Sequence, residues 1–163
     1  MRLPILVLLV ALASAGGAHA ATPVNGPAAL VTTLYKTYAW EAVIDQPDLS
    51  SLDLFEQPRN VLAQYFDEHL VGLILRDREC AEKTHGVCRL YCMPMWSNQD
   101  PGATDLIIQQ TDKATIVSVR FRYPGNGEHI ALTYQLSQTA KGWRISDIRG
   151  ASFSLLSVLS SKM

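Results

Sequence analysis

The sequence predicts an α+β domain in which two helices pack on one face of an antiparallel sheet. In the N-terminal half, apolar residues recur every three to four positions, which is the period of an amphipathic helix. In the second half, apolar and polar residues alternate, and short turn sequences separate the alternating runs. Helices followed by an antiparallel meander bury one sheet face and leave the other to solvent.

The first helix is predicted to begin at Pro27, since proline fits the first turn of a helix. Its apolar residues repeat every four positions: Leu30, Leu34, Tyr38 and Ala42. We expect it to end near Asp45, because Gln46 precedes Pro47 and a residue before proline avoids helical geometry.

The second helix is predicted to open at Pro58 and to end between Arg78 and Gly86. A wide apolar stripe runs along it, made of Val61, Leu62, Tyr65, Phe66, Leu70, Leu73 and Ile74. The strands are expected at 105–110 (the weakest pattern), 117–123, 130–136 and 143–148, with turns at 124–127 and 141–142. Residues 153–159 predict a short terminal helix or a tail packed on the core.

The first 20 residues have the layout of a secretory signal peptide. Arg2 gives a positive start, residues 5–13 form an apolar run, and Ala18-His19-Ala20 is a typical cleavage sequence. The apolar stretch is shorter than the roughly 20 residues that a membrane-spanning helix needs. We therefore expect a periplasmic or secreted protein, cut after Ala20.

The mature chain is expected to be soluble and unanchored, because Ala21 and not a cysteine follows the predicted cut. Residues 21–26 form a flexible start, and residues 27–163 form one domain. Removing residues 1–20 takes away one of 14 Lys+Arg and none of 15 Asp+Glu, which leaves a charge of −2. That balance gives no reason to expect nucleic acid or an anionic membrane as a partner.

Three cysteines lie close together, at positions 80, 88 and 92. Together with His85 they could form a zinc site, but only Cys88 and Cys92 have the spacing typical of zinc ligands, so no metal is assigned. In an oxidising compartment, nearby cysteines favour a structural disulfide. Cys80 can pair with Cys88 or with Cys92, since both loops contribute about 2.5–3 kcal/mol in the loop-entropy model. The third thiol is either buried or available to a second chain.

The chain carries no local catalytic motif, so no catalytic residue and no cofactor is assigned. Four residues are candidates for a pocket or a functional loop: His69, Asp100, Tyr134 and Asp147. Asp100 lies in a turn sequence and either serves the turn alone or lines the mouth of a pocket between the sheet and the helices. Tyr134 belongs either to the core or to a ligand cage.

Three arginines, Arg120, Arg122 and Arg144, are predicted to share the outer face of the sheet with Thr133 and Gln135. Such a face is usually just solvated. The alternative is a docking surface for an acidic partner or for a second copy, because arginine is enriched at interfaces.

The segment 141–148, Lys-Gly-Trp-Arg-Ile-Ser-Asp-Ile, resembles the last strand of nuclear-transport-factor-2-like domains. With Asn98-Gln99-Asp100 it is similar, more narrowly, to the exported bacterial proteins called domain of unknown function 3828. The resemblance runs from Pro27 to Leu159. It implies a cone-shaped domain with a strongly bent sheet wrapped around helices, and it implies no reaction.

These observations favour a non-enzymatic periplasmic or secreted binding module. It would hold a small apolar ligand in the cone, or dock an envelope protein through the open sheet face. One alternative is an enzyme of the isomerase or dehydratase type that uses His69 or Asp100 as a base. Another is an immunity or inhibitor protein directed against a toxin or a lytic enzyme.

Overall fold

A computed structural model describes residues 25–43 and 52–161 of the chain. The predicted signal peptide and Asp45, the predicted end of the first helix, lie outside these residues. Within them, the α-helix already ends at Tyr38 and gives way to a single 3-10 turn at Ala39–Ala42, so the prediction of one α-helix to near Asp45 was too long. None of the helices in the described part of the chain is long and apolar enough to cross a membrane.

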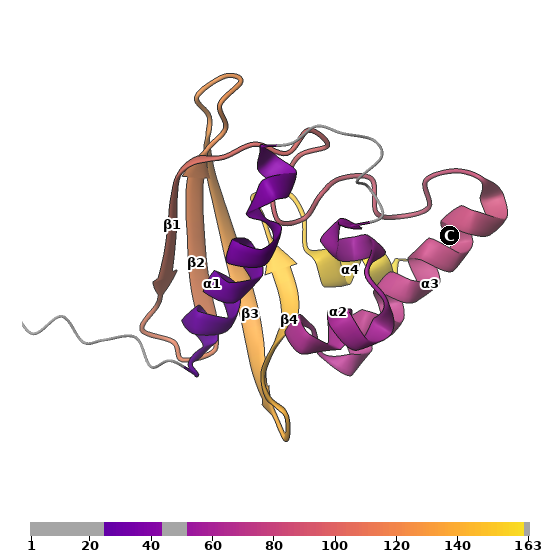
Figure 1. The fold of residues 1–163 in the computed structure, drawn as a ribbon, viewed down its shortest axis with the longest axis horizontal. Coiled ribbons are helices and arrows are strands. Elements are labelled where there is room, and N and C mark those ends of the chain that lie inside the picture. The colour runs from indigo at the N-terminus through magenta and orange to yellow at the C-terminus, as the bar shows by residue number, and fades with distance from the viewer. Residues whose placement is uncertain (1–24, 44–51, 162–163) are drawn as a thin grey trace, which may run out of the picture.

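The sheet is an antiparallel meander, as the alternating pattern predicted. Its strands lie in the order in which they follow along the chain: β1 (Thr104–Gln110), β2 (Ile116–Arg122), β3 (His129–Thr139) and β4 (Gly142–Arg149). Figure 1 shows the four strands side by side. The register between β3 and β4 shifts once, because Gln135 pairs with Asp147 and the next residue, Leu136, pairs with Ile145. Ser146 is thus the extra residue of a bulge, which bends β4.

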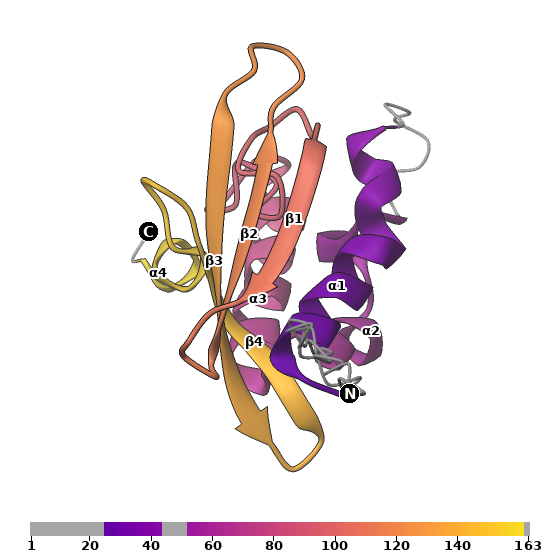
Figure 2. The same ribbon diagram turned by 90° about the vertical axis from the view of Figure 1, so that its left-hand side faces the viewer.

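The helices lie on both sides of this sheet. They are α1 (Pro27–Tyr38), the single turns η1 (Ala39–Ala42) and η3 (Leu54–Glu56), α2 (Arg59–Tyr65), α3 (Glu68–Thr84) and α4 (Leu155–Ser160). Figure 2 shows the sheet almost edge-on, with α1 and α2 on one side and α4 on the other. The terminal helix α4 contacts both β4 and α3.

The prediction of one continuous second helix was wrong, because the chain breaks at Phe66 and Asp67. Phe66 is extended and forms a parallel bridge with Ile145 of β4, and the Asp67 N–H donates to the Ile145 carbonyl at 3.0 Å. The Asp67 side chain then caps α3 by accepting from the Leu70 N–H at 2.8 Å. The hydrogen bonds to the sheet edge and to the Asp67 cap replace those that the helix loses at the break. Because the apolar stripe continues across the break, the sequence pattern does not reveal it.

The core lies between the helices and the inner face of the sheet. Alternate strand residues point into it, among them Val117, Val119, Phe121, Leu132, Tyr134, Leu136, Ile145 and Ile148. From the loop between α3 and β1, Met95 and Trp96 enter the same core, and each is about 1% exposed. Side chains therefore fill the centre of the space between sheet and helices where the sequence analysis placed an apolar ligand, although a cavity of about 520 Å³ opens between α1 and β1.

The terminal helix is held by the buried carboxylate of Asp147, which is 1% exposed. Its Oδ1 accepts from the Leu156 N–H at 2.9 Å, and its Oδ2 accepts from the Ser154 hydroxyl at 2.9 Å and from Arg149 Nε at 2.6 Å. Ser154 in turn caps α4 by accepting from the Ser157 N–H. One carboxylate thus fixes the start of α4 against the last strand.

The substitution Asp147→Asn should weaken the docking of α4. An amide group in place of Oδ2 cannot accept from both Ser154 and Arg149, and we expect a loss of about 1–3 kcal/mol in the free energy of unfolding. Urea denaturation followed by circular dichroism measures this loss. The matched control is Asp112→Asn, at an exposed aspartate, and an equal effect of both substitutions would contradict the anchoring role.

Candidate functional site

The structure separates the four candidate pocket residues. Asp147 is engaged under α4, and Asp100 is exposed in the turn region before β1. Tyr134 is fully buried: its hydroxyl donates to the Tyr35 hydroxyl at 2.9 Å, which donates to the Met95 carbonyl at 2.8 Å. Burial raises the pKa values of both tyrosines, so both stay neutral donors. Only His69 of the four lines a described surface cavity.

The three candidate arginines do not form one surface. Arg120 and Arg122 are exposed on β2, where Arg122 pairs with Asp105 of β1 at 3.4 Å. Arg144 instead donates through Nε to the Ala63 carbonyl of α2 at 2.8 Å. This hydrogen bond satisfies one of the carbonyl groups that lack a helical partner at the end of α2, so Arg144 has a structural role.

A buried carboxylate that the sequence analysis did not single out lies in η1. Glu41 is 5% exposed, and it accepts from the Leu54 N–H at 2.8 Å and from the Trp96 indole N–H at 3.0 Å. Burial raises its pKa, although the two hydrogen bonds act in the opposite direction. The one clue in the sequence is Trp96, whose N–H needs an acceptor once it is buried.

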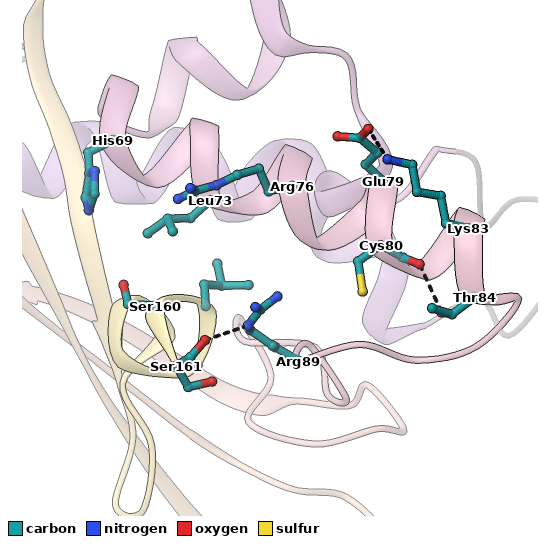
Figure 3. Close-up of a pocket in the computed structure, with 11 residues that line it drawn as sticks. His69, Leu73, Arg76, Glu79, Cys80, Lys83, Thr84, Arg89, Ser160 and Ser161 are labelled. Carbon is teal, nitrogen blue, oxygen red and sulfur yellow. Dashed lines mark hydrogen bonds and ion pairs between the residues drawn. The ribbon is translucent and has the colours of Figure 1, made fainter. Parts of the chain in front are cut away.

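A groove of about 770 Å³ lies between α3 and α4, is lined by several charged side chains, and is called here the α3–α4 groove. Figure 3 shows His69, Arg76 and Arg89 facing this space. Leu73 of α3 and Leu159 of α4 contribute its apolar surface.

The groove follows one face of α3. His69, Arg76 and Lys83 line it at intervals of seven residues, which is close to two helical turns. This spacing was the signal in the sequence, and it was missed because the apolar stripe dominated the interpretation of the helix. Three Lys/Arg residues line the groove but only one carboxylate, Glu79, and Lys83 pairs with that carboxylate at 2.6 Å. Arg76 has no hydrogen-bond or ion-pair partner among the described residues.

Arg89 reaches the groove from the loop after α3, and three connections hold it there. The buried Asp77 side chain accepts from the backbone N–H groups of Arg89 and Leu90 at 2.9 and 3.0 Å. Arg89 Nε donates to the Ser161 carbonyl at 2.9 Å. A disulfide joins Cys80 to Cys88, with 6.1 Å between their Cα atoms.

The structure thus contains the shorter of the two disulfides that the sequence left open, and Cys92 keeps a half-buried thiol whose pKa is raised by burial. Among the described residues, no group of three or more His, Cys, Asp or Glu side chains is placed to hold a metal ion.

No model of a known protein family matches the chain, and no curated protein matches it. Among solved structures, it is similar to a phospholipid-binding protein from Ralstonia solanacearum, determined in complex with a phospholipid. The two chains are 18% identical, with a TM-score of 0.45 over 82% of this chain and 83% of the other. A likeness this weak assigns neither a family nor a ligand to this chain.

The raised pKa of Glu41 predicts a stability that falls as the pH rises. Between the ordinary glutamate value of 4.5 and the higher value in the folded protein, the folded state binds more protons than the unfolded state, so increasing pH favours unfolding. Glu41→Gln should remove this dependence. The same substitution should lower the free energy of unfolding by about 1–3 kcal/mol, because an amide cannot accept from both Leu54 and Trp96.

Urea titrations from pH 4 upward test both effects. An unchanged pH profile in Glu41→Gln would contradict the assignment, and Glu82→Gln, at an exposed site on α3, is the control.

Peptide mapping of the oxidised protein should link Cys80 to Cys88 and recover Cys92 as a free thiol. Replacing Cys80 and Cys88 together with serine should lower the free energy of unfolding by roughly 2.5 kcal/mol, the loop-entropy value for nine residues. A bridge to Cys92, or three free thiols, would refute the pairing.

Proposed function

We propose that this protein is an exported, non-enzymatic binding module whose α3–α4 groove holds a small amphiphilic anion. The ligand would carry an apolar tail and a carboxylate or phosphate group. The observation that carries this proposal is the unpartnered Arg76 beside Leu73, in a groove lined by two further cationic side chains.

Two chemical features of the groove support such a ligand. Guanidinium groups form strong paired hydrogen bonds with carboxylate and phosphate, so Arg76 fits an anionic group. Arg89 adds positive charge to the same groove, although its guanidinium also donates to the Ser161 carbonyl and lies 3.6 Å from Asp77 Oδ1. Leu73 and Leu159 line the groove and give it an apolar floor for a tail, although each is only 4% exposed. A volume of about 770 Å³ also lies within the usual range for small-molecule sites.

Binding is favoured over catalysis by the surroundings of the candidate bases. Asp147 accepts three hydrogen bonds beneath α4, and Tyr134 is enclosed in the core. His69 faces the groove, but the only carboxylate that lines the groove with it is Glu79, which is paired with Lys83. An isomerase or dehydratase would need a base held against its substrate by a second group.

Export and family membership are parts of the same proposal. The layout of residues 1–20 supports export, and the disulfide is consistent with an oxidising compartment. Kinship with nuclear-transport-factor-2-like domains is supported by helices that precede a four-stranded meander and by Trp143 and Ile145 in its last strand. The bulge that bends β4 is consistent with a curved sheet.

Isothermal titration calorimetry with decanoate, monodecyl phosphate and uncharged decanol tests the ligand chemistry. We expect both anions to bind and decanol to bind at least tenfold more weakly, since a charged hydrogen bond contributes about 1.5–3 kcal/mol. The two anions distinguish a carboxylate ligand from a phosphate ligand.

Arg76→Gln should weaken binding of the preferred anion at least tenfold, whereas Arg122→Gln, at an exposed arginine on β2, should leave it unchanged. Equal affinity for decanol and the anions would overturn the proposal, and so would an affinity that Arg76→Gln leaves intact.

A further inference from the structure

A second groove, of about 410 Å³, lies where η3 meets the loop that follows α3; we call it the η3 groove. Its apolar lining comes from Phe55, Val87, Leu90, Tyr91 and Met93. Three carboxylates, those of Glu41, Asp53 and Glu56, also line it, and no lysine or arginine does. Its charge is therefore opposite to that of the α3–α4 groove.

Apolar side chains at this groove are unusually accessible. Val87 is 71% exposed and Tyr91 is 59% exposed, and both stand next to the half-buried Phe55 and Leu90. Scattered exposed apolar residues need no explanation, but large ones grouped around a cavity mark interaction sites. Tyrosine in particular is enriched at protein interfaces.

The three carboxylates of the η3 groove differ in whether they have hydrogen-bond or ion-pair partners. Glu41 is engaged by Leu54 and Trp96, and Glu56 lies 3.4 Å from Arg78 Nε. Asp53 is half-buried, and its side chain has no partner among the described residues. Burial, together with the charge of Glu56, raises the pKa of Asp53. A cation placed in the groove would therefore be stabilised by a carboxylate that has no competing partner.

We propose that the η3 groove is a docking surface for a segment of a partner protein that presents a lysine or arginine beside an apolar side chain. The cationic group pairs with Asp53, and the apolar side chain packs between Phe55, Val87 and Tyr91. Charge complementarity selects this occupant, because an acidic or neutral segment would leave the Asp53 carboxylate unpaired beneath it. This docking surface does not depend on what the α3–α4 groove binds.

The test uses the full oxidised protein, labelled with ¹⁵N, and three capped pentapeptides: Ala-Arg-Phe-Arg-Ala and its analogues with glutamine or glutamate in place of arginine. On adding the arginine peptide, we expect backbone amide shifts at Phe55, Val87 and Tyr91. Its affinity should be at least fivefold higher than that of the glutamine peptide, and the glutamate peptide should bind most weakly. Added salt should reduce the difference between the three peptides.

Asp53→Asn should lower the affinity for the arginine peptide at least fivefold and bring it near that of the glutamine peptide. Tyr91→Ala, at an exposed position, should weaken all three peptides. Glu82→Gln, which removes an exposed carboxylate from α3 outside the groove, should change none of these affinities. Shifts confined to α3 and α4 or to the outer sheet face would overturn the proposal. Equal binding of the arginine and glutamine peptides, or an Asp53→Asn variant of unchanged affinity, would do the same.

Discussion

The buried carboxylate of Glu41 is the interaction on which much of this structure depends. It joins the turn after α1 to Leu54 at the start of η3 and to Trp96 in the loop before β1. An ionisable group is costly to bury without hydrogen bonds, so these distant segments have to close together around it. The Trp96 ring, once anchored, packs edge-on against Tyr35 and Phe121, with ring centroids 5.3 and 5.9 Å apart. Helix, loop and sheet are thereby joined in one core.

The order and type of the elements follow from the sequence, because periods of two and 3.6 residues are local properties. The three clearest strands, the weaker strand β1 and the terminal helix all lie where they were expected. The break at Phe66 could not be predicted, since it depends on a bridge to Ile145, far along the chain, and leaves the apolar stripe unchanged. Likewise, the alternating pattern places Arg144 on the outer face of the sheet, but its side chain donates a hydrogen bond to the Ala63 carbonyl near the end of α2.

The candidate sites were harder to predict than the fold for the same reason. His69 was a candidate from the sequence, and Arg76 shares its face of α3, but Arg89 joins them only when the loop after α3 folds back along the helix. Tyr134 and Asp147 were candidates on the last two strands, yet Tyr134 donates to Tyr35 in the core and Asp147 accepts hydrogen bonds at the start of α4. Polar residues in such patterns serve the core as readily as a ligand, and only tertiary contacts distinguish the two uses.

The loop after α3 lines both grooves, with Arg89 on one side and Val87, Leu90 and Tyr91 on the other. The disulfide and the Asp77 carboxylate already hold it in place. Because this loop is already ordered before binding, it loses little conformational entropy when a ligand or a partner segment binds at either groove. Reducing the disulfide would transfer that entropy loss from folding to binding, so affinity at the η3 groove would depend on the redox state of a bond that does not line it.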